Sequence, residues 1–223
     1  MTNQLKIQYM SNMTRVEREA LLKKEKADDE IKELHKRQGC PEGYVFHLSA
    51  EQLKYQLNQL AHNDPDLDSL NWAGQKVGDK MILKLALSLK ENTNCTTIDL
   101  KDCRMTADSA AVLAQTLSSK RIGRLTLSDN PLGDNGIQFV LDAAMKPDVM
   151  WYRIEAKNIG ATKASLIRTS HVMHVNHHMW EVQFKENEFS PDDWMLYGQI
   201  TEKFRLRRLN EIKYFQHRGS RVS

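Results

Sequence analysis

The chain has 223 residues, of which 27% are charged and 7% aromatic, a composition typical of a globular protein, with a formal net charge of +3. It contains no apolar run of the roughly 18–20 residues needed to span a bilayer and no apolar secretory segment at its N-terminus, so we expect neither membrane insertion nor secretion. Three dispersed cysteines indicate free thiols in a reducing, cytoplasmic compartment rather than a disulfide framework.

A charged arm opens the chain. Residues 13–38 interleave acidic and basic side chains without Gly or Pro, and pairs such as Glu19 and Lys23 have the i, i+4 spacing that supports a helix. The apolar stripe is thin and too short for a self-sufficient coiled coil. Gly39 and Pro41 predict the end of this helix. A solvated helix, a helix docked on a partner and a disordered segment all remain open.

A short amphipathic helix follows the arm. Ser49 and Gln52 have the spacing of a capping box, in which each residue bonds the backbone N–H of the other. The helix presents three leucines on one face, namely Leu53, Leu57 and Leu60. Because the first unit of a repeat array exposes an apolar face, we predict that residues 49–62 cover it.

A spaced apolar pattern recurs through the middle of the chain and is clearest at residues 122–132. Its marker positions are three apolar strand residues, an asparagine and a further apolar residue: Ile122, Leu125, Leu127, Asn130 and Leu132. The pattern begins at residues 67, 95, 122, 149 and 179, so the steps are 28, 27, 27 and 30 residues. These steps are typical of leucine-rich repeats of about 20–29 residues, with one step slightly long.

Helical patterns separate the predicted strands. Apolar residues recur at spacings of three and four in residues 79–90, 107–117 and 134–145. A single strand–turn–helix unit cannot bury its own apolar face, but stacked units form a continuous core. The pattern therefore predicts an α/β solenoid with a parallel sheet on its concave side.

This arrangement resembles the leucine-rich-repeat family, specifically its ribonuclease-inhibitor-like branch. The resemblance rests on the repeat length, on the helix openings Gly78-Asp79 and Gly133-Asp134-Asn135-Gly136, and on the helix-to-strand link at residues 89–94. It covers about residues 67–205 and implies a binding scaffold whose partners differ widely among such proteins. The asparagine position departs from the family at Lys157, where the fourth repeat is irregular.

Residues that could carry chemistry are few. His171, His174 and His178 would share one face of a helix, but they lie just before a predicted strand, and we predict no metal site. Cys95 and Cys103 fall on core positions and are expected to be buried structural thiols. Phosphate-binding, nucleophile and zinc-protease motifs are missing from the sequence. We therefore predict a protein that is not an enzyme and uses no cofactor.

Binding is expected on the concave face, where alternate strand residues point away from the core. The predicted partner-binding residues gather in the third to fifth repeats: Arg124, Trp151, Arg153, Glu155, Glu181, Gln183 and Lys185. Trp and Arg are enriched at the energetic centres of interfaces, so an exposed Trp151 would anchor a partner. Two alternatives stay open for it: burial beneath the C-terminal helix, or a strand register that differs by one residue.

A long helix ends the chain, beginning with Ser190 as N-cap and Pro191 at the first helical position. We expect this helix to cover the end of the repeat array and then to extend beyond it. Residues 203–223 carry a net charge of +6, so the preceding 202 residues carry −3. The basic residues singled out here are Arg205, Arg207, Arg208, Lys213 and Arg218. A solvated face, an acidic protein such as tubulin and a nucleic acid are the candidate surroundings of this basic tail.

The predicted fold is a short solenoid of about five leucine-rich repeats with an N-terminal helical arm and a C-terminal capping helix. The expected divisions are residues 1–48, 49–66, 67–205 and 206–223 for arm, cap, repeats and basic tail. The function we expect is a non-catalytic scaffold or adaptor subunit of a larger assembly, with the cytoskeleton and the ciliary axoneme as candidate settings. A soluble regulator that holds one protein in its concavity, such as an actin-end-capping protein, and an RNA-associated subunit are the alternatives.

Overall fold

The structure is a computed structural model that describes residues 47–146 and 149–219, with side chains described up to residue 210. The chain divides into two units, residues 1–46 and 47–223, and only the second is described below. The arm helix predicted at residues 13–38 lies outside the described residues.

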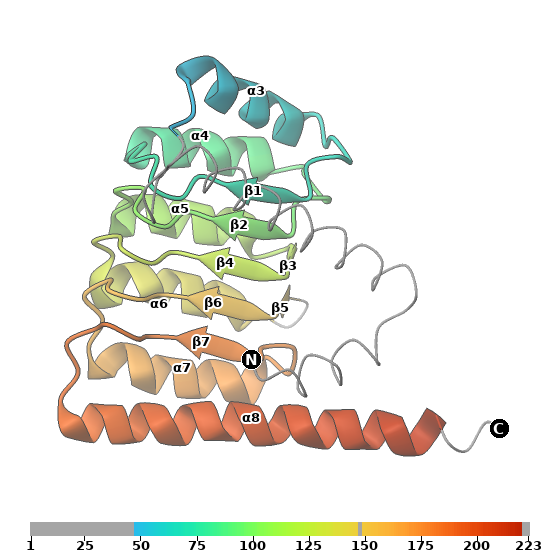
Figure 1. Ribbon diagram of the computed structural model, residues 1–223, viewed down its shortest axis with the longest axis vertical. Helices are drawn as coiled ribbons and strands as arrows, with labels where there is room; N and C mark the ends of the chain where they lie inside the picture. Colours follow the sequence, from blue (N-terminus) through green and yellow to red (C-terminus); the bar gives the residue numbers. More distant parts are fainter. Residues whose placement is uncertain (1–46, 147–148, 220–223) are drawn as a thin grey trace, which may run out of the picture. The chain divides into compact units, whose positions relative to one another are not determined.

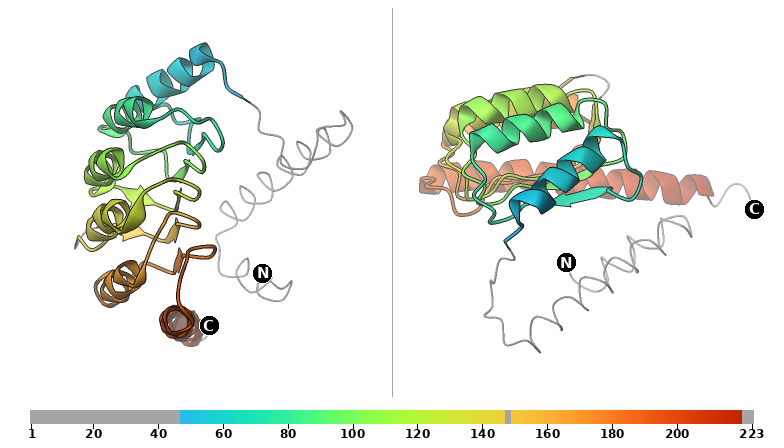
Figure 2. Two further views of the ribbon diagram at one scale, coloured as in Figure 1. Left: turned by 90° about the vertical axis from the view of Figure 1, so that its left-hand side faces the viewer. Right: turned by 90° about the horizontal axis from the view of Figure 1, so that it is seen from above.

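The described chain forms a parallel sheet of five strands in the order β1-β2-β4-β6-β7. The strands are β1 Ser69–Asn71, β2 Thr97–Asp99, β4 Arg124–Thr126, β6 Arg153–Glu155 and β7 Glu181–Gln183. The helices between them stack on one side of the sheet (Figures 1 and 2): α4 Asp79–Leu89, α5 Ala107–Leu117, α6 Gly133–Ala144 and α7 Lys163–Val175. A two-stranded sheet pairs β3 Arg121–Ile122 with β5 Met150–Trp151. The predicted leucine-rich-repeat architecture is confirmed.

The core lies between the sheet and the helices and follows the predicted alternation along each strand. One inward column is fully or almost fully buried: Leu70, Ile98, Leu125, Ile154 and Val182. The next inward column is also buried: Trp72, Leu100, Leu127, Ala156 and Phe184. Each repeat contributes one residue to each column, so no single repeat has a complete core without its neighbours.

The fourth repeat begins two residues later than the sequence pattern predicts. Strand pairing places Leu125 opposite Ile154 and Ile122 opposite Trp151. The repeats therefore start at residues 67, 95, 122, 151 and 179, and their steps are 28, 27, 29 and 28 residues. A shift of two residues keeps Ile154 pointing toward the core, so the apolar alternation within β6 cannot detect it.

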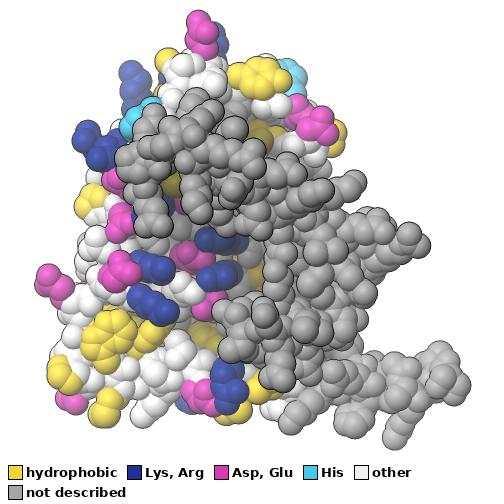
Figure 3. Space-filling model, viewed as in Figure 1, with side chains coloured by type: hydrophobic (Ala, Val, Ile, Leu, Met, Phe, Trp, Pro, Cys, Tyr) yellow, Lys and Arg dark blue, Asp and Glu magenta, His cyan; other side chains and the backbone are white. Residues whose placement is uncertain are grey.

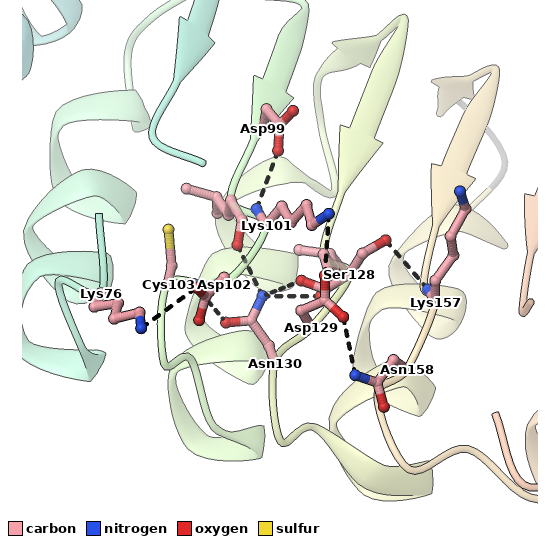
Figure 4. Close-up of polar contacts among 12 residues, drawn as sticks. Lys76, Asp99, Lys101, Asp102, Cys103, Ser128, Asp129, Asn130, Lys157 and Asn158 are labelled. Carbon is pink, nitrogen blue, oxygen red and sulfur yellow. Dashed lines mark hydrogen bonds and ion pairs between the residues drawn. The ribbon is translucent and has the colours of Figure 1, made fainter. Parts of the chain in front are cut away.

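Asn130 lies in the third repeat and hydrogen-bonds to the turn of the second repeat. Its Oδ1 atom accepts the backbone N–H groups of Cys103 and Met105 at 3.0 and 2.9 Å. Its Nδ2 atom donates to the carbonyl oxygens of Leu100 and Leu127 at 2.8 and 2.9 Å (Figure 4 shows the site). One buried side chain thus satisfies backbone groups in two successive repeats, which explains why asparagine is favoured at this position.

Asn187 makes the equivalent contacts between the fourth and fifth repeats. It accepts from the N–H groups of Ile159 and Ala161 at 3.0 Å each and donates to the carbonyl oxygen of Ala156 at 3.0 Å. The corrected register places Ile159, not Lys157, at the asparagine position of the fourth repeat. The fourth repeat therefore does depart from asparagine, but at Ile159, and the assignment of this position to Lys157 is wrong, since Lys157 lies in the turn just before it.

Two aspartates, each in the first turn of a repeat helix, also hydrogen-bond to the repeat that follows. Asp79 accepts hydrogen bonds from the Thr106 backbone N–H at 2.8 Å, the Thr106 hydroxyl at 2.9 Å and the Ser109 hydroxyl at 2.5 Å. Asp134 binds the fourth repeat in the same way, at Thr162 and Ser165. Burial opposes ionisation of Asp79, but the hydrogen bonds from Ser109 and Thr106 outweigh it and lower the pKa of the carboxyl. The second and fourth repeats are therefore held by an aspartate before them and an asparagine after them.

The predicted cap helix is α3, Ala50–Ala61. Its capping box is confirmed, because the Ser49 hydroxyl accepts from the Gln52 N–H at 3.1 Å and the Gln52 side chain accepts from the Ser49 N–H at 2.7 Å. Leu53 and Leu60 are buried against the first repeat, and Gln56 accepts the indole N–H of Trp72 at 2.7 Å.

Helix α8, Pro191–Gly219, covers the last repeat and extends beyond it at its C-terminal end (Figure 1). Tyr197 lies along the open edge of β7, where its hydroxyl accepts the Phe184 N–H at 3.3 Å and donates to the Val182 carbonyl at 3.4 Å. A side chain thus satisfies two groups that a sixth strand would otherwise pair. Ile200 and Phe204, two residues of α8, are buried. Within the described residues, helices with the length and apolar character of a membrane span are absent.

Candidate functional site

Side chains that leave the sheet on the side opposite the core form three columns across the repeats. Column one is Ser69, Thr97, Arg124, Arg153 and Glu181. Column two is Asn71, Asp99, Thr126, Glu155 and Gln183. Column three, two residues further along each chain segment, is Ala73, Lys101, Ser128, Lys157 and Lys185. Figure 3 shows Lys and Arg side chains gathered with acidic ones over the middle of this concave face.

Four charged residues of columns one and two meet on strands β4, β6 and β7, and we refer to them as the charged tetrad: Arg124, Arg153, Glu155 and Glu181. The Nε atoms of Arg124 and Arg153 each lie 3.0 Å from Oε1 of Glu155. The Arg153 Nε atom is also 3.2 Å from Oε2 of Glu181. Gln183 donates to the other oxygen of Glu181 at 2.7 Å. Five of the seven predicted partner-binding residues are thus brought together.

Burial within the tetrad is unequal. The Glu155 side chain is only 8% exposed, whereas Arg124 and Arg153 are 46% and 37% exposed. A buried carboxylate requires nearby positive charge, which the two guanidinium groups supply. Asp99, on the next strand, is half-buried, and this burial raises the pKa of its carboxyl even though the Lys101 N–H and the Arg124 charge act to lower it.

Three buried polar atoms at this point have no hydrogen-bond partner: Oγ1 of Thr126, Nε of Arg153 and Oε1 of Glu155. The two charged atoms attract each other across 3.0 Å, but their orientation does not make a hydrogen bond. Thr126 lies directly opposite Glu155 in the strand pairing. Buried polar groups in folded proteins are nearly always hydrogen-bonded, so three such atoms without a hydrogen bond in one place are unusual.

Trp151 is not part of this surface, and the prediction that it is exposed is wrong. It lies in β5 opposite Ile122 and is fully buried. The cause is the two-residue shift of the fourth repeat, which moves Trp151 to the first apolar position of its unit. Its indole N–H has no hydrogen-bond partner, so the ring serves the core through its apolar surface.

Column three shows what the sequence prediction missed. Lys185 lies just beyond β7 and is exposed, as predicted, and Lys101 shares its column, but the prediction did not place Lys157 there. The side chain of Lys101 forms an ion pair with Asp129 at 3.2 Å, and the backbone N–H of Lys157 donates to the Ser128 hydroxyl at 3.2 Å (Figure 4). Repeat length was the signal that would have placed Lys157 here, since a start at residue 151 gives steps of 29 and 28 residues in place of 27 and 30.

The predicted basic tail is partly engaged with the repeats. Arg207 donates to the backbone carbonyl oxygens of Met173 and Met179, and the guanidinium of Arg208 lies 4.9 Å from the ring centre of Trp180. Arg205 is paired with Glu202 on α8 itself. The side chains of Lys213 and Arg218 lie outside the described residues. Arg207 and Arg208 therefore hold α8 on the last repeat.

The remaining reactive side chains offer no chemical site. Burial raises the pKa of the Cys95 thiol to about 11 and that of Cys103 to about 12, which confirms the expected structural thiols. His171 and His174 lie on α7 and His178 lies beyond its end. Across the described part of the chain, groups of three or more potential metal ligands do not occur.

Comparisons with known proteins support the fold. The chain matches no family model. It is 32% identical over 101 residues to human NACHT, LRR and PYD domains-containing protein 5, covering 44% of this chain and 8% of that protein. It is 25% identical over 138 residues to Sus scrofa ribonuclease inhibitor, covering 61% of this chain and 30% of the inhibitor. The chain therefore spans less than a third of the length of either relative.

Two solved structures share the architecture. The leiomodin-1 actin-binding site 2 structure aligns with a TM-score of 0.62 at 15% identity and covers 77% of this chain and 99% of its own. The Caenorhabditis elegans tropomodulin C-terminal domain aligns with a TM-score of 0.56 at 17% identity and covers 71% of this chain and 98% of its own. Together with the sequence matches, these confirm the resemblance to leucine-rich-repeat proteins that the repeat pattern predicts.

Proposed function

We propose that this chain, a leucine-rich-repeat solenoid, is a non-catalytic subunit that binds a protein partner on the concave face of its sheet. The charged tetrad carries the proposal, because it places two half-exposed arginines around a buried carboxylate at the centre of that face. Arginines held in this way are typical anchors of protein interfaces.

The comparisons support a protein partner. One relative is by name an inhibitor of a ribonuclease, and one structural neighbour is by title an actin-binding site. Leucine-rich-repeat folds host many functions, so the partner must be identified from the surface of this chain rather than from the fold. We propose a scaffold or adaptor role in a cytoskeletal assembly, in the cytoplasm, with actin and tubulin as the first partners to test. The ciliary axoneme is one setting for such a subunit, and tubulin binding is the result that would identify it.

Two other functions compete with this proposal. A regulator that holds one protein in its concavity would use the same face but would form a complex of two chains. An RNA-associated subunit would use the basic tail, and the engagement of Arg207 and Arg208 with the last repeat makes this the least favoured reading.

Affinity purification of the full chain at low salt, followed by identification of co-purifying proteins and RNA, tests the proposal. Cosedimentation of the purified chain with actin filaments and with microtubules then tests the cytoskeletal role. The diagnostic variant is Glu181→Lys combined with Lys185→Glu, because both side chains lie on the concave face and substitution there should leave the core intact. Lys84→Glu, on the exposed face of α4, is the matched control.

We expect the concave variant to lose the partner and the control to retain it. Equal recovery with both variants would contradict binding by the concave face. Recovery that disappears after nuclease treatment would instead favour the RNA-associated subunit.

A further inference from the structure

The corrected register reveals a charge pattern on the concave face. The two outer columns carry five basic residues in the second to fifth repeats: Arg124, Arg153, Lys101, Lys157 and Lys185. Of the acidic residues, Glu155 is buried and Asp99 half-buried in the column between them, and Glu181 is the more exposed one at 44%. Basic residues therefore outnumber acidic ones in the two outer columns, and the acidic residues between these columns are buried or half-buried.

The arginines of the tetrad remain accessible to a further anion. The Nε atom of each lies 3.0 Å from Oε1 of Glu155, yet the side chains of Arg124 and Arg153 are 46% and 37% exposed. We call this exposed part of each arginine its outer edge. The terminal nitrogens of a guanidinium group match the two oxygens of a carboxylate, and a bidentate contact of this kind is stronger than a contact with a lysine ammonium.

The Thr126 hydroxyl beside the tetrad is costly for the folded chain alone, because it is buried without a hydrogen bond. An arrangement that lowers stability and is kept in a regular repeat is expected where a fold serves binding. The polar scaffold of the neighbouring turns is, by contrast, fully hydrogen-bonded at Asn130.

We propose that the concave face receives an acidic segment of the partner protein, one of whose carboxylates lies against the outer edges of Arg124 and Arg153. This inference rests on the proposed function and specifies the chemistry of the partner. The lysines of column three provide further favourable contacts for neighbouring acidic side chains.

A protein segment fits this face better than a nucleic acid. Glu181 lies next to Arg153 and Asp99 lies on the strand next to that of Arg124, so negative charge interrupts the basic columns. A continuous phosphate backbone would pass these carboxylates at close range, whereas an acidic peptide presents separate charges between neutral backbone groups.

The inference is tested with a fluorescent peptide of alternating glutamate and glycine as probe, measured by anisotropy against the full chain at low and at physiological salt. We expect saturable binding that weakens as salt rises. Replacing one arginine by glutamine, Arg124→Gln or Arg153→Gln, should weaken binding about tenfold. The Nε–Hε NMR signals of these two arginines should shift on titration of the unlabelled peptide.

Folding is controlled with conservative variants. Arg124→Lys combined with Arg153→Lys keeps the charge that Glu155 needs but removes the planar forks, so it should fold and still bind the probe about fivefold more weakly. Arg168→Gln is the matched control, because Arg168 forms a similarly exposed ion pair with Asp142 at 2.5 Å on the helical side of the molecule. It should leave probe binding unchanged.

Several results would overturn the inference: no binding of the probe, equally tight binding of poly-L-lysine, equal weakening by Arg168→Gln, or tighter arginine-dependent binding of polyuridylate. The two proposals can also fail separately. A cellular partner that binds the lysine double variant as tightly as the natural chain would remove the acidic-segment inference and leave the proposed function standing. A chain that binds the probe as expected but recovers no protein partner would remove the proposed function instead.

Discussion

Asn130 and Thr126 belong to the same repeat and are almost equally buried, at 1% and 3% exposure, yet only the side chain of Asn130 is hydrogen-bonded. The side chain of Asn130 donates to or accepts from backbone groups of two repeats. The hydroxyl of Thr126, which lies opposite Glu155 in the strand pairing, has no hydrogen-bond partner. The turns use polar side chains to join the repeats, whereas the concave face keeps polar groups that the isolated chain does not satisfy.

This contrast separates the scaffold from the surface that we propose binds a partner. A fully bonded polar network fixes the structure in which it lies, because removing one member leaves buried groups unsatisfied. A buried hydroxyl without a partner has the reverse effect, because replacing it with an apolar group of similar shape can raise stability. Substitution of Asn130 and of Thr126 should therefore change stability in opposite directions. Four substitutions, one of them in the apolar core, follow from the largest expected effect to the smallest.

Trp151→Ala should lower the free energy of unfolding by about 3–5 kcal/mol, because it removes a large, fully buried side chain from the core. Chemical denaturation checks this directly. Trp151→Phe is the control, since it keeps most of the apolar surface and removes only an indole N–H that has no partner. A Trp151→Ala variant as stable as the natural chain would contradict the burial of Trp151 and favour its position on the exposed face.

Asn130→Ala should lower the free energy of unfolding by about 3 kcal/mol, since it leaves the N–H groups of Cys103 and Met105 without their partner in a buried turn. Hydrogen exchange should locate the loss of protection in the second and third repeats. Gln75→Ala, at the equivalent position of the first repeat, should cost less because Gln75 is only partly buried. Equal losses from both substitutions would contradict a special role for Asn130.

Asp79→Asn should lower stability by about 1–2 kcal/mol at neutral pH, because the amide nitrogen cannot accept the Thr106 hydroxyl. In the folded chain the hydrogen bonds of Asp79 and Asp134 outweigh burial and hold each pKa below the usual value of 3.8. Their contribution is therefore fully present above that value and is lost as the pH falls through the lower folded pKa.

Thermal unfolding measured as a function of pH tests this linkage. The natural chain should lose stability more steeply on acidification than Asp79→Asn. Asp99 acts in the opposite direction, since burial raises its pKa and favours the folded state at low pH. Parallel pH profiles for the two chains would show that Asp79 is not linked to folding.

Thr126→Val should raise the free energy of unfolding by about 1 kcal/mol, because it replaces an unpaired buried hydroxyl with a methyl group of similar size. Thr169→Val is the matched control and should lower stability, since the equally buried hydroxyl of Thr169 donates to the Ser165 carbonyl at 2.9 Å. Denaturant midpoints compare the two. A loss of stability in both variants would show that Thr126 belongs to the scaffold.

Much of the fold was predictable from local patterns. The helix expected at residues 107–117 is α5, Ala107–Leu117, and the capping box at Ser49 forms as its spacing requires. Both depend on residues close together in the chain. The candidate site was predicted less completely: five of its residues follow from strand alternation, but Lys157 was missed and Trp151 was misplaced.

The sequence by itself determined the repeated unit, the faces of its strands and helices, and its two capped ends, because each follows from apolar spacing or from contacts within one turn of helix. Only the tertiary structure decided which residues lie side by side in neighbouring repeats. Both candidate registers of the fourth repeat bury Ile154 and Ile159, and the backbone pairing of β6 with its neighbours selects the one that places Ile154 beside Leu125. That choice buries Trp151, aligns Arg153 with Glu181 and moves Lys157 to the concave face.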